Sequence, residues 1–273
     1  MTETVSDRRL VQIRQGRMAM HTWGAEGEPV VLLHPLALAG GLWQPLAQAL
    51  ADEFQVFAPD QRGCGDTSWD GDGFSIEDMA GDLAQALDTL AIPSVHVLGM
   101  SMGGGVAMTF AARHPHRVRS LTLADTTAWY GENAVTAWAE RAEKALSVPR
   151  EKQVTFQVDR WFSEAFREAN PAQVQRVVDI FVATDSKAHA AACRAMGAMD
   201  ARDQLPTIIA RTLVMVGEQD YATPPDLAET LARGIPGASL LVLPALRHMS
   251  LIEKPELAAV IRAHLRNQPP AAQ

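Results

Sequence analysis

The stretch VHVLGMSMGGGVAMTFAAR, residues 95–113, decides the fold of this chain. It begins with an apolar run typical of a buried strand and ends with a run typical of a helix. The two runs are joined by Gly99-Met100-Ser101-Met102-Gly103. This turn is so tight that the serine must adopt a strained backbone. Side chains at the two outer glycines would collide with the neighbouring strand and helix. The serine hydroxyl then stands beside a helix N-terminus, whose amides favour developing negative charge. We therefore predict that Ser101 is a nucleophile.

The same turn also fits a simpler interpretation, in which Ser101 only caps the helix. A serine nucleophile differs because it needs an acid and then a histidine later in the chain. Asp220 follows the apolar run 212–217, and His248 follows the apolar run 239–243. In a parallel sheet both residues lie beyond the carboxyl ends of strands, where such folds place their sites.

These residue types fit one chemistry, the attack of a hydroxyl on a carbonyl carbon. His248 is the predicted base, which takes the proton of Ser101 and passes it to the leaving group. Asp220 is predicted to hold the imidazole tautomer and to stabilise the imidazolium. Asp125, after the apolar run 121–124, is an alternative acid that we interpret as a loop anchor or pocket wall.

Two backbone amides are predicted to stabilise the oxyanion. One belongs to Met102, the residue after the nucleophile. The other is expected in the loop after residues 30–33, which begins His34-Pro35-Leu36. Because Pro35 has no N–H, we assign the second donor to Leu36. We interpret His34 as a structural histidine of this loop and keep it as a candidate substrate contact.

Composition and charge exclude several classes of protein. The 273 residues are enough for one large α/β domain with an insertion, or for two small domains. A net charge of −8 without a basic stripe predicts no nucleic-acid partner. Cys64 and Cys193 give neither a disulfide framework nor metal-ligand spacing, so we predict no metal and no cofactor. The N-terminus lacks a signal peptide's apolar core and no run is long enough to span a bilayer, which predicts a cytoplasmic protein without membrane contact. A homodimer is left open.

Apolar runs alternate with helical patterns along most of the chain, which predicts a mostly parallel sheet with helices on both faces. One of these helices is expected to begin after Ser75, in capping-box style, and to continue to about Leu90. Between residues 127 and 203 only helical patterns are found. We therefore predict a core in two parts, 1–126 and 204–273, with residues 127–203 inserted as a helical lid over the serine.

Several lid residues are candidate substrate contacts. Trp129 and Trp161 are retained as such, together with Met249 beside His248, although lid aromatics more often fill the lid's own core. Three basic side chains are possible partners for a substrate carboxylate, with a solvated helix face as the simpler interpretation: Arg160, Lys187 and Arg194.

With this turn, the loop DQRGCG at 60–65, Asp220 and His248 in order, the chain resembles the α/β-hydrolase superfamily along almost its full length. Within it, the chain resembles 3-oxoadipate enol-lactonases in GMSMGG at 99–104, Arg160-Trp161-Phe162 in the lid, the region 193–205 and GEQDYATPP at 217–225. The resemblance implies an α/β-hydrolase fold and hydrolysis of a small enol-lactone in aromatic catabolism. It also implies the triad of Ser101, Asp220 and His248.

The leading prediction is a cofactor-free serine hydrolase that cleaves a small carboxylic ester or lactone through an acyl-enzyme. The same triad also fits carbon–carbon bond hydrolysis of a ring-cleavage product, or a cofactor-free perhydrolase. Outside enzymes, the alternative is a non-catalytic domain that binds a small ligand. The intact set of serine, acid and histidine argues against it, because binding alone needs no nucleophile.

Overall fold

Eight strands form one sheet in the order β1-β2-β4-β3-β5-β6-β7-β8 in the computed structural model, which describes residues 7–268. Strands β3 to β8 make only parallel pairs with one another, whereas β2 pairs antiparallel with both β1 and β4. The predicted mostly parallel sheet is therefore confirmed. The strands are β1 (Asp7–Ile13), β2 (Gly16–Trp23), β3 (Glu28–Leu33), β4 (Phe54–Pro59), β5 (Val95–Met100), β6 (Val118–Ala124), β7 (Arg211–Gly217) and β8 (Ser239–Leu243).

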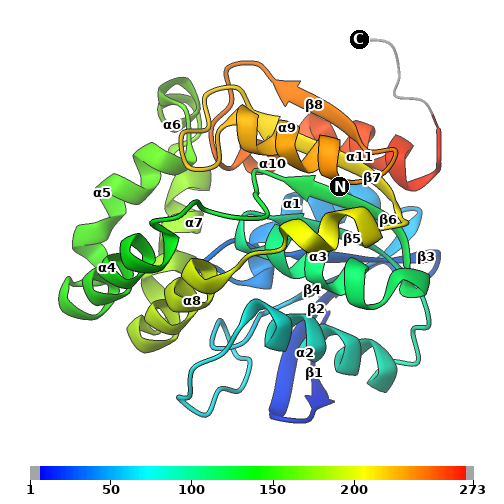
Figure 1. Ribbon diagram of the computed structural model, residues 1–273, viewed down its shortest axis with the longest axis horizontal. Coiled ribbons are helices and arrows are strands. Elements are labelled where there is room, and N and C mark those ends of the chain that lie inside the picture. The colour runs from blue at the N-terminus through cyan, green and yellow to red at the C-terminus, as the bar shows by residue number, and fades with distance from the viewer. Residues whose placement is uncertain (1–6, 269–273) are drawn as a thin grey trace.

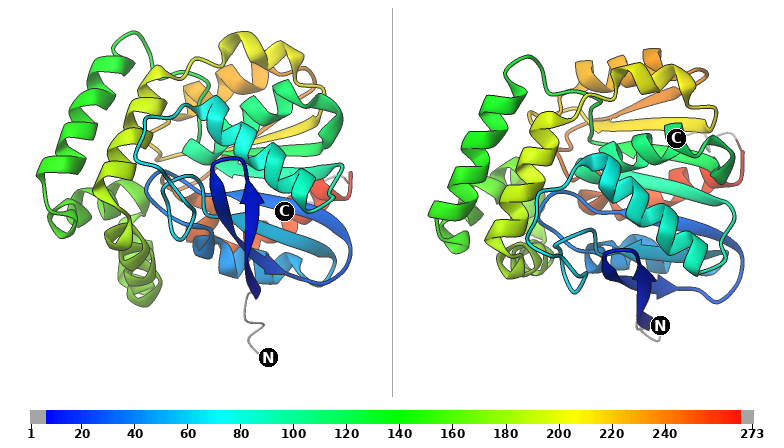
Figure 2. Two further views of the ribbon diagram at one scale, coloured as in Figure 1. Left: turned by 90° about the horizontal axis from the view of Figure 1, so that it is seen from below. Right: turned by 60° about the horizontal axis from the view of Figure 1, so that its bottom comes forward.

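Helices cover both faces of this sheet (Figures 1 and 2). One face carries α2 (Ile76–Thr89), α3 (Met102–Arg113) and α9 (Pro225–Gly234), and the other carries α1 (Gln44–Leu50) and α11 (Ala258–Leu265). Every residue of β5 is buried, and its successive side chains enter opposite cores: Val97 packs on the first face and Leu98 on the second. A strand buried on both faces reads as a continuous apolar run, which is what the sequence shows.

Helix α2 begins where the sequence predicts. The Ser75 hydroxyl accepts a hydrogen bond from the Asp78 N–H at 3.1 Å, and the Asp78 carboxylate accepts one from the Ser75 N–H at 2.8 Å. This capping box satisfies donors that the first helical turn leaves unpaired. Short 3-10 helices connect other elements: η1 (Gly40–Trp43), η2 (Pro115–Arg117), η3 (Arg202–Thr207) and η4 (Pro255–Leu257).

Five helices follow one another between β6 and β7: α4 (Ala134–Ser147), α5 (Arg150–Trp161), α6 (Glu164–Ala169), α7 (Pro171–Ala183) and α8 (Ser186–Ala198). All lie within the range 127–203, which we call the lid. Figure 1 shows them at the end of the sheet towards which β6 and β8 point. A short bridge between Trp129 and Asp200 joins the segments that enter and leave the lid.

Within residues 7–268, none of the helices combines the length and the apolar character that crossing a membrane requires.

Candidate active site

The turn from β5 into α3 is strained. Ser101 has a φ of +54° and a ψ of −120°. A Cβ atom at Gly99 would lie 2.1 Å from the Gly103 carbonyl oxygen, and one at Gly103 would lie 2.2 Å from that of Leu33, so neither position tolerates a side chain. The Ser101 hydroxyl makes no capping hydrogen bond to α3. The helix-cap interpretation is therefore wrong, and the strain serves to present the hydroxyl.

Hydrogen bonds from the adjacent strand hold this backbone in place. The Ser101 N–H donates to the Ala124 carbonyl at 3.0 Å, and the Ser101 carbonyl accepts from the Thr126 hydroxyl at 2.7 Å. Thr126 also packs where a side chain at position 104 would stand, since a Cβ atom at Gly104 would lie 2.5 Å from it. Sequence reasoning missed Thr126, because its role depends on the pairing of β5 with β6.

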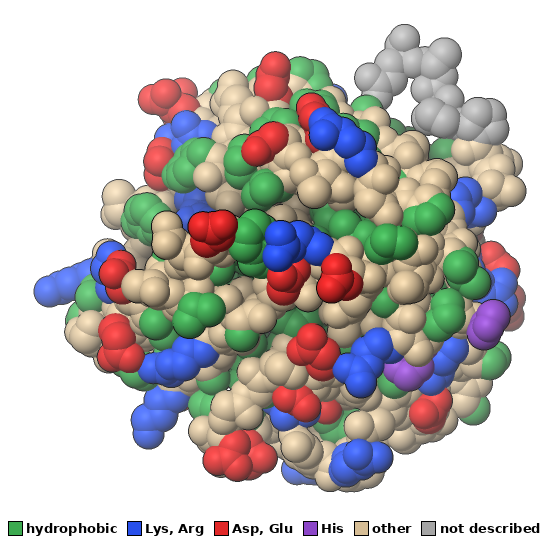
Figure 3. Space-filling model, viewed as in Figure 1, with side chains coloured by type: hydrophobic (Ala, Val, Ile, Leu, Met, Phe, Trp, Pro, Cys, Tyr) green, Lys and Arg blue, Asp and Glu red, His purple; other side chains and the backbone are tan. Residues whose placement is uncertain are grey.

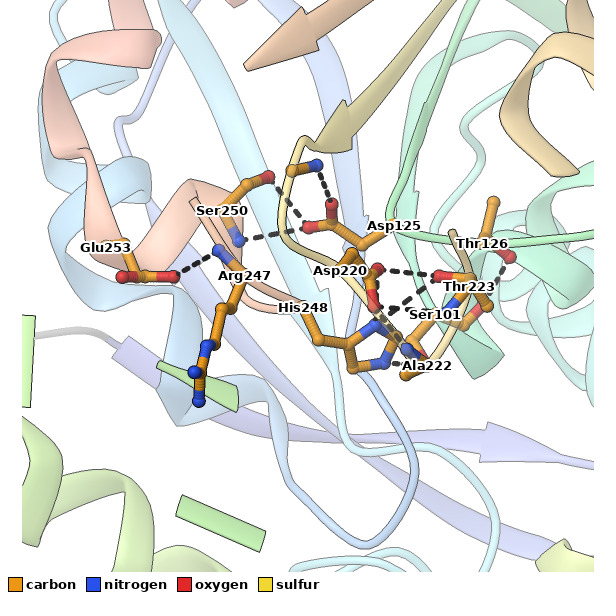
Figure 4. A network of polar contacts seen from close by, with 11 residues as sticks. Ser101, Asp125, Thr126, Asp220, Ala222, Thr223, Arg247, His248, Ser250 and Glu253 are labelled. Atoms are coloured by element: carbon orange, nitrogen blue, oxygen red, sulfur yellow. Dashed lines mark hydrogen bonds and ion pairs between the residues drawn. The ribbon is translucent and has the colours of Figure 1, made fainter. Parts of the chain in front are cut away.

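Three side chains from separate loops meet at this turn (Figure 4). Nε2 of His248 lies 2.9 Å from the Ser101 hydroxyl oxygen, and Nδ1 lies 2.8 Å from Oδ2 of Asp220. Asp220 follows β7 and His248 follows β8, so the parallel strands deliver both to the same edge of the sheet. Ser101 and His248 are each 6% exposed and Asp220 is 2% exposed, so their mutual hydrogen bonds are shielded from water.

The surroundings of Asp220 keep it ionised. Its Oδ1 accepts from the Ala222 N–H at 2.7 Å and the Thr223 N–H at 3.0 Å, and its Oδ2 accepts from the Thr223 hydroxyl at 2.8 Å. Burial alone would raise the pKa of Asp220, but the charge of His248 and these hydrogen bonds hold it below its ordinary value. A carboxylate at Nδ1 requires that nitrogen to carry the ring hydrogen. Nε2 is then left free to accept the Ser101 proton.

Asp125, the alternative acid, has a different place (Figure 4). Its Oδ1 accepts from the Gly217 N–H at 3.0 Å, while its Oδ2 accepts from the Ser250 N–H at 3.0 Å and the Ser250 hydroxyl at 2.7 Å. Burial and then the charge of Asp220 raise the pKa of Asp125. It is a loop anchor, which ties the end of β7 before Asp220 to the segment just after His248.

Glu253, at the end of α10 (Ser250–Glu253), fixes the other side of the histidine loop. It accepts from the Arg247 N–H at 2.7 Å through one oxygen, and from the Ser163 N–H at 2.9 Å and hydroxyl at 2.6 Å through the other. The residue before His248 is thereby connected to the start of α6 in the lid. Sequence reasoning also missed this connection, which spans 90 positions.

A cavity of about 20 Å³ lies over the serine, room for about one water molecule. The core contributes Pro35, Leu36, Ser101, Thr223 and His248 to its wall. The lid contributes Tyr130, Trp138, Arg141, Gln157, Arg160, Trp161, Phe181 and His189. The Ser101 hydroxyl is therefore enclosed between the sheet edge and the lid.

The two predicted oxyanion donors belong to the loop after β3 and to the first turn of α3. Leu36 lines the cavity together with Ser101. Met102 is the first residue of α3, so its N–H has no acceptor within the helix. The role of these two amides as oxyanion donors stays a prediction.

His34 does not face the cavity. Its Nε2 accepts from the Gln61 N–H at 2.9 Å, which leaves the ring hydrogen on Nδ1, and Nδ1 donates to the Pro35 carbonyl at 2.8 Å. Both ring nitrogens are thus used within the loop, and burial lowers the pKa of His34 to about 4. These hydrogen bonds support the structural interpretation of His34, and its role as a substrate contact stays a prediction that they do not favour.

Of the other three predicted contacts, only Trp161 lines the cavity. Trp129 instead lies under the Arg202 guanidinium, 3.7 Å from ring centre to guanidinium carbon, at the base of the lid. Met249 is fully buried in the core, and its N–H donates to the Trp161 carbonyl at 3.0 Å. Neither Trp129 nor Met249 lines this cavity, so their role as substrate contacts stays a prediction that these contacts do not support.

The basic lid residues divide into two groups. Lys187 is exposed, and Arg194 pairs on the surface with Glu143 at 2.8 Å, an exposed type of pair that contributes less than about 1 kcal/mol. Charges of both signs are interspersed on the molecular face in Figure 3. Arg160 differs, because it lines the cavity together with Arg141, which sequence reasoning missed.

Neither Arg141 nor Arg160 forms an ion pair with any residue of the described range 7–268. Burial lowers the pKa of Arg141 to about 10 and also lowers that of Arg160, so both remain charged at neutral pH. Partly buried cations without counterions are costly. The lid side of the cavity is therefore suited to an anionic group.

Residues 28–255 match the family model described as the alpha/beta hydrolase fold. The chain belongs to this family. This α/β hydrolase is 30% identical over 251 residues to 3-oxoadipate enol-lactonase 1 of Acinetobacter baylyi, an alignment that covers 90% of this chain and 92% of that protein. It is also 30% identical over 262 residues to 2-hydroxy-6-oxo-2,4-heptadienoate hydrolase of Pseudomonas putida, covering 86% and 87% of the two chains.

A solved structure extends the comparison. The crystal structure of the enol-lactonase from Burkholderia xenovorans matches this α/β hydrolase with a TM-score of 0.89 at 30% identity, over 94% of this chain and 100% of that chain. The fold class and the resemblance to enol-lactonases that the sequence predicts are therefore confirmed.

Proposed function

We propose that this α/β hydrolase is a serine hydrolase of a small, carboxylate-bearing lactone or carboxylic ester, most similar in reaction to the enol-lactonases. The observation that carries the proposal is the continuous hydrogen-bond chain from Asp220 through His248 to the strained Ser101, with contacts of 2.8 and 2.9 Å. A hydroxyl is a weak nucleophile until an adjacent base removes its proton, and this chain supplies that base.

The reaction runs through an acyl-enzyme. The Ser101 oxygen attacks the carbonyl carbon as Nε2 of His248 takes its proton, and the amides of Met102 and Leu36 bind the resulting oxyanion. When the carbon–oxygen bond to the leaving group breaks, His248 returns the proton to that oxygen. In a lactone the leaving hydroxyl stays attached to the acyl group. Water, deprotonated by His248, then attacks the acyl carbon and releases Ser101.

The lid supports the substrate class. Arg141 and Arg160 supply two positive charges that no described side chain neutralises, so a substrate carboxylate is their complement. Asp125 does not oppose this assignment, because its carboxylate binds Gly217 and Ser250 behind the site rather than lining the cavity. The names of two relatives, both called enol-lactonases, agree with a small acidic lactone.

Substrate entry requires movement of the lid, since a cavity of about 20 Å³ holds no organic acid. A second hollow of about 360 Å³ opens on the outside of the lid between α4 and α5. The two spaces share four wall residues: Tyr130, Trp138, Arg141 and Arg160. We place the route of entry through this shared wall.

Carbon–carbon bond hydrolysis is the second candidate. It is supported by the relative from Pseudomonas putida, whose printed name is that of a heptadienoate hydrolase. The same serine, histidine and aspartate serve either reaction, so the substrate decides between the two.

The test is turnover of a panel of small lactones, p-nitrophenyl esters and dienone-type ring-cleavage acids by wild type and by Ser101→Ala. We expect burst release of p-nitrophenol by wild type, preference for carboxylate-bearing lactones, and no burst from Ser101→Ala. Cleavage of the dienone acids without lactone turnover would favour the second candidate. Equal activity in wild type and Ser101→Ala would refute a serine mechanism. Ligand binding without turnover of any substrate would support the alternative of a non-catalytic, ligand-binding domain.

A further inference from the structure

His189, on α8, has a polar atom without a partner. Its Nε2 is buried and makes no hydrogen bond, and the whole residue is 2% exposed. Within residues 7–268, it is the only residue lining the Ser101 cavity that has such an atom. Leaving a buried polar group unpaired destabilises the folded protein. Because His189 lines the cavity over Ser101, an atom of a bound ligand is a candidate partner for this nitrogen.

Arg150 determines which kind of partner His189 requires. Its Nη1 lies 2.6 Å from Nδ1 of His189, and a guanidinium can only donate, so Nδ1 must accept. Burial, and then the charges of Arg150 and Arg141, lower the pKa of His189 to about 3, so the ring is neutral. A neutral ring that accepts at Nδ1 carries its hydrogen on Nε2. The unpaired atom is therefore a hydrogen-bond donor.

Arg150 is itself held rigidly. Its Nε donates to the Phe181 carbonyl at 3.0 Å, Nη2 donates to the same oxygen, and the guanidinium carbon lies 3.8 Å from the centre of the Phe181 ring. Phe181 stands in the last turn of α7, where free carbonyls favour a positive charge. Burial lowers the pKa of Arg150 to about 10, which leaves it charged at neutral pH. A guanidinium cannot accept a hydrogen bond, so Arg150 fixes the tautomer of His189.

We infer that the Nε2–H of His189 is a specificity-determining donor, which binds a neutral carbonyl oxygen of the substrate other than the one that Ser101 attacks. Arg150 is its positioning residue. The inference rests on the proposed function, because the acceptor belongs to the ester or lactone cleaved at Ser101. A neutral donor complements a neutral oxygen, whereas Arg141 and Arg160 already provide the charge that a carboxylate needs.

Two esters that differ in one carbonyl test the assignment: p-nitrophenyl 4-oxopentanoate and p-nitrophenyl pentanoate. We expect wild type to prefer the oxo ester by about tenfold in kcat/KM, mainly through KM, since one hydrogen bond from a buried donor is at stake. In His189→Phe the ratio of the two kcat/KM values should fall to about one. In His189→Gln the side-chain amide N–H can replace the ring N–H, so part of the preference for the oxo ester should return. An unchanged ratio in His189→Phe would overturn the inference.

The positioning role of Arg150 has its own control in the lid. Arg150→Met should lower the same ratio, because His189 can then adopt either tautomer. Arg176→Met removes a half-buried lid arginine, which donates to the Gly41 and Leu42 carbonyls and does not line the cavity, and it should leave the ratio unchanged. Equal ratios in the two variants would overturn the role of Arg150.

Nitrogen-15 NMR of the histidine-labelled protein decides the tautomer without any substrate. We expect His189 to bear its hydrogen on Nε2 in wild type and in Arg176→Met, and to populate both tautomers in Arg150→Met. A hydrogen on Nδ1 in wild type would overturn the inference even if ester turnover is normal. If Ser101→Ala hydrolyses both esters as fast as wild type, it is the proposed function that fails, and the NMR result still decides the assignment at His189.

Discussion

The two sides of the cavity differ in how their polar groups are satisfied. On the core side, both carboxylate oxygens of Asp220 and both ring nitrogens of His248 have hydrogen-bond partners, and Asp125 anchors the loops that carry them. On the lid side, Arg141 and Arg160 have no counterion among residues 7–268, and Nε2 of His189 has no partner there. Under the proposed function this difference implies a division of roles, in which the core is complete before substrate arrives and performs the chemistry, whereas the lid is completed by the substrate and selects it.

The largest effect should come from the core. Asp220→Asn keeps the shape of the side chain but places an amide against Nδ1 of His248, so the imidazole is no longer held in the tautomer that accepts the Ser101 proton. By analogy with the corresponding change in serine proteases, we expect kcat to fall by about 10⁴-fold. Stopped-flow and steady-state ester hydrolysis measure it. A fall in kcat of less than about tenfold would contradict the role of Asp220 in holding the tautomer of His248.

A smaller effect is expected when a charge is removed from the lid. Arg160→Gln should lower kcat/KM for a carboxylate-bearing lactone by about 10- to 100-fold, because a charge-assisted hydrogen bond to the substrate is lost. Hydrolysis of an uncharged ester of the same size should change much less. Arg194→Gln is the matched control, since that arginine pairs with Glu143 on the lid surface. If Arg160→Gln and Arg194→Gln show the same fall in kcat/KM for the carboxylate-bearing lactone, Arg160 does not bind the substrate carboxylate.

Asp125→Asn tests the anchor that separates the two sides. Whichever way the new amide is turned, its NH2 group replaces an acceptor, either at the Gly217 N–H or at the Ser250 N–H and hydroxyl, so the protein should lose about 1–3 kcal/mol of unfolding free energy. Urea denaturation followed by circular dichroism measures the loss. Because Asp125 does not touch His248 or Ser101 directly, kcat at a temperature where the variant is folded should fall far less than in Asp220→Asn. An equal fall would make Asp125 the acid of the triad.

The smallest effect concerns pH. The pKa of Asp220 is lowered by folding, so its ionisation stabilises the folded state at any pH above the ordinary value of 3.8. As the pH falls below 3.8 the unfolded chain takes up this proton first, and the contribution disappears as the pH passes through the folded pKa. The contribution of Asp220 to the unfolding free energy, measured as the difference between wild type and Asp220→Asn, should therefore shrink as the pH falls below about 4. A difference that grows on acidification would contradict a lowered pKa.

The sequence was sufficient to predict the core side of the site. Ser101 lies in a local pattern whose geometry follows from its glycines, and Asp220 and His248 each follow a strand, so the parallel sheet alone brings them to one edge. Thr126 and Glu253 could not be predicted, because they act through strand pairing and through a contact between the histidine loop and α6.

The lid was predicted as a segment but not in its details. Which side of a helix faces the serine depends on how α4, α5 and α8 pack, and a charged residue near the cavity looks the same in sequence as one on the surface. Arg141 and Arg194 illustrate this: Arg141, which lines the cavity, was missed, whereas Arg194, which is exposed, was a candidate. For the same reason the sequence could not show that the Trp129 ring packs on Arg202 at the base of the lid.

The most direct test of the central claim is intact-protein and peptide mass spectrometry of the hydrolase quenched in acid during turnover of a p-nitrophenyl ester. We predict a mass increase equal to one acyl group, located on Ser101. The acylated protein should be more abundant in Asp220→Asn if that change slows deacylation more than acylation. The mass increase should be absent from Ser101→Ala. An acyl group on another residue, or turnover at the wild-type rate with no acyl group in any quenched sample, would contradict the account.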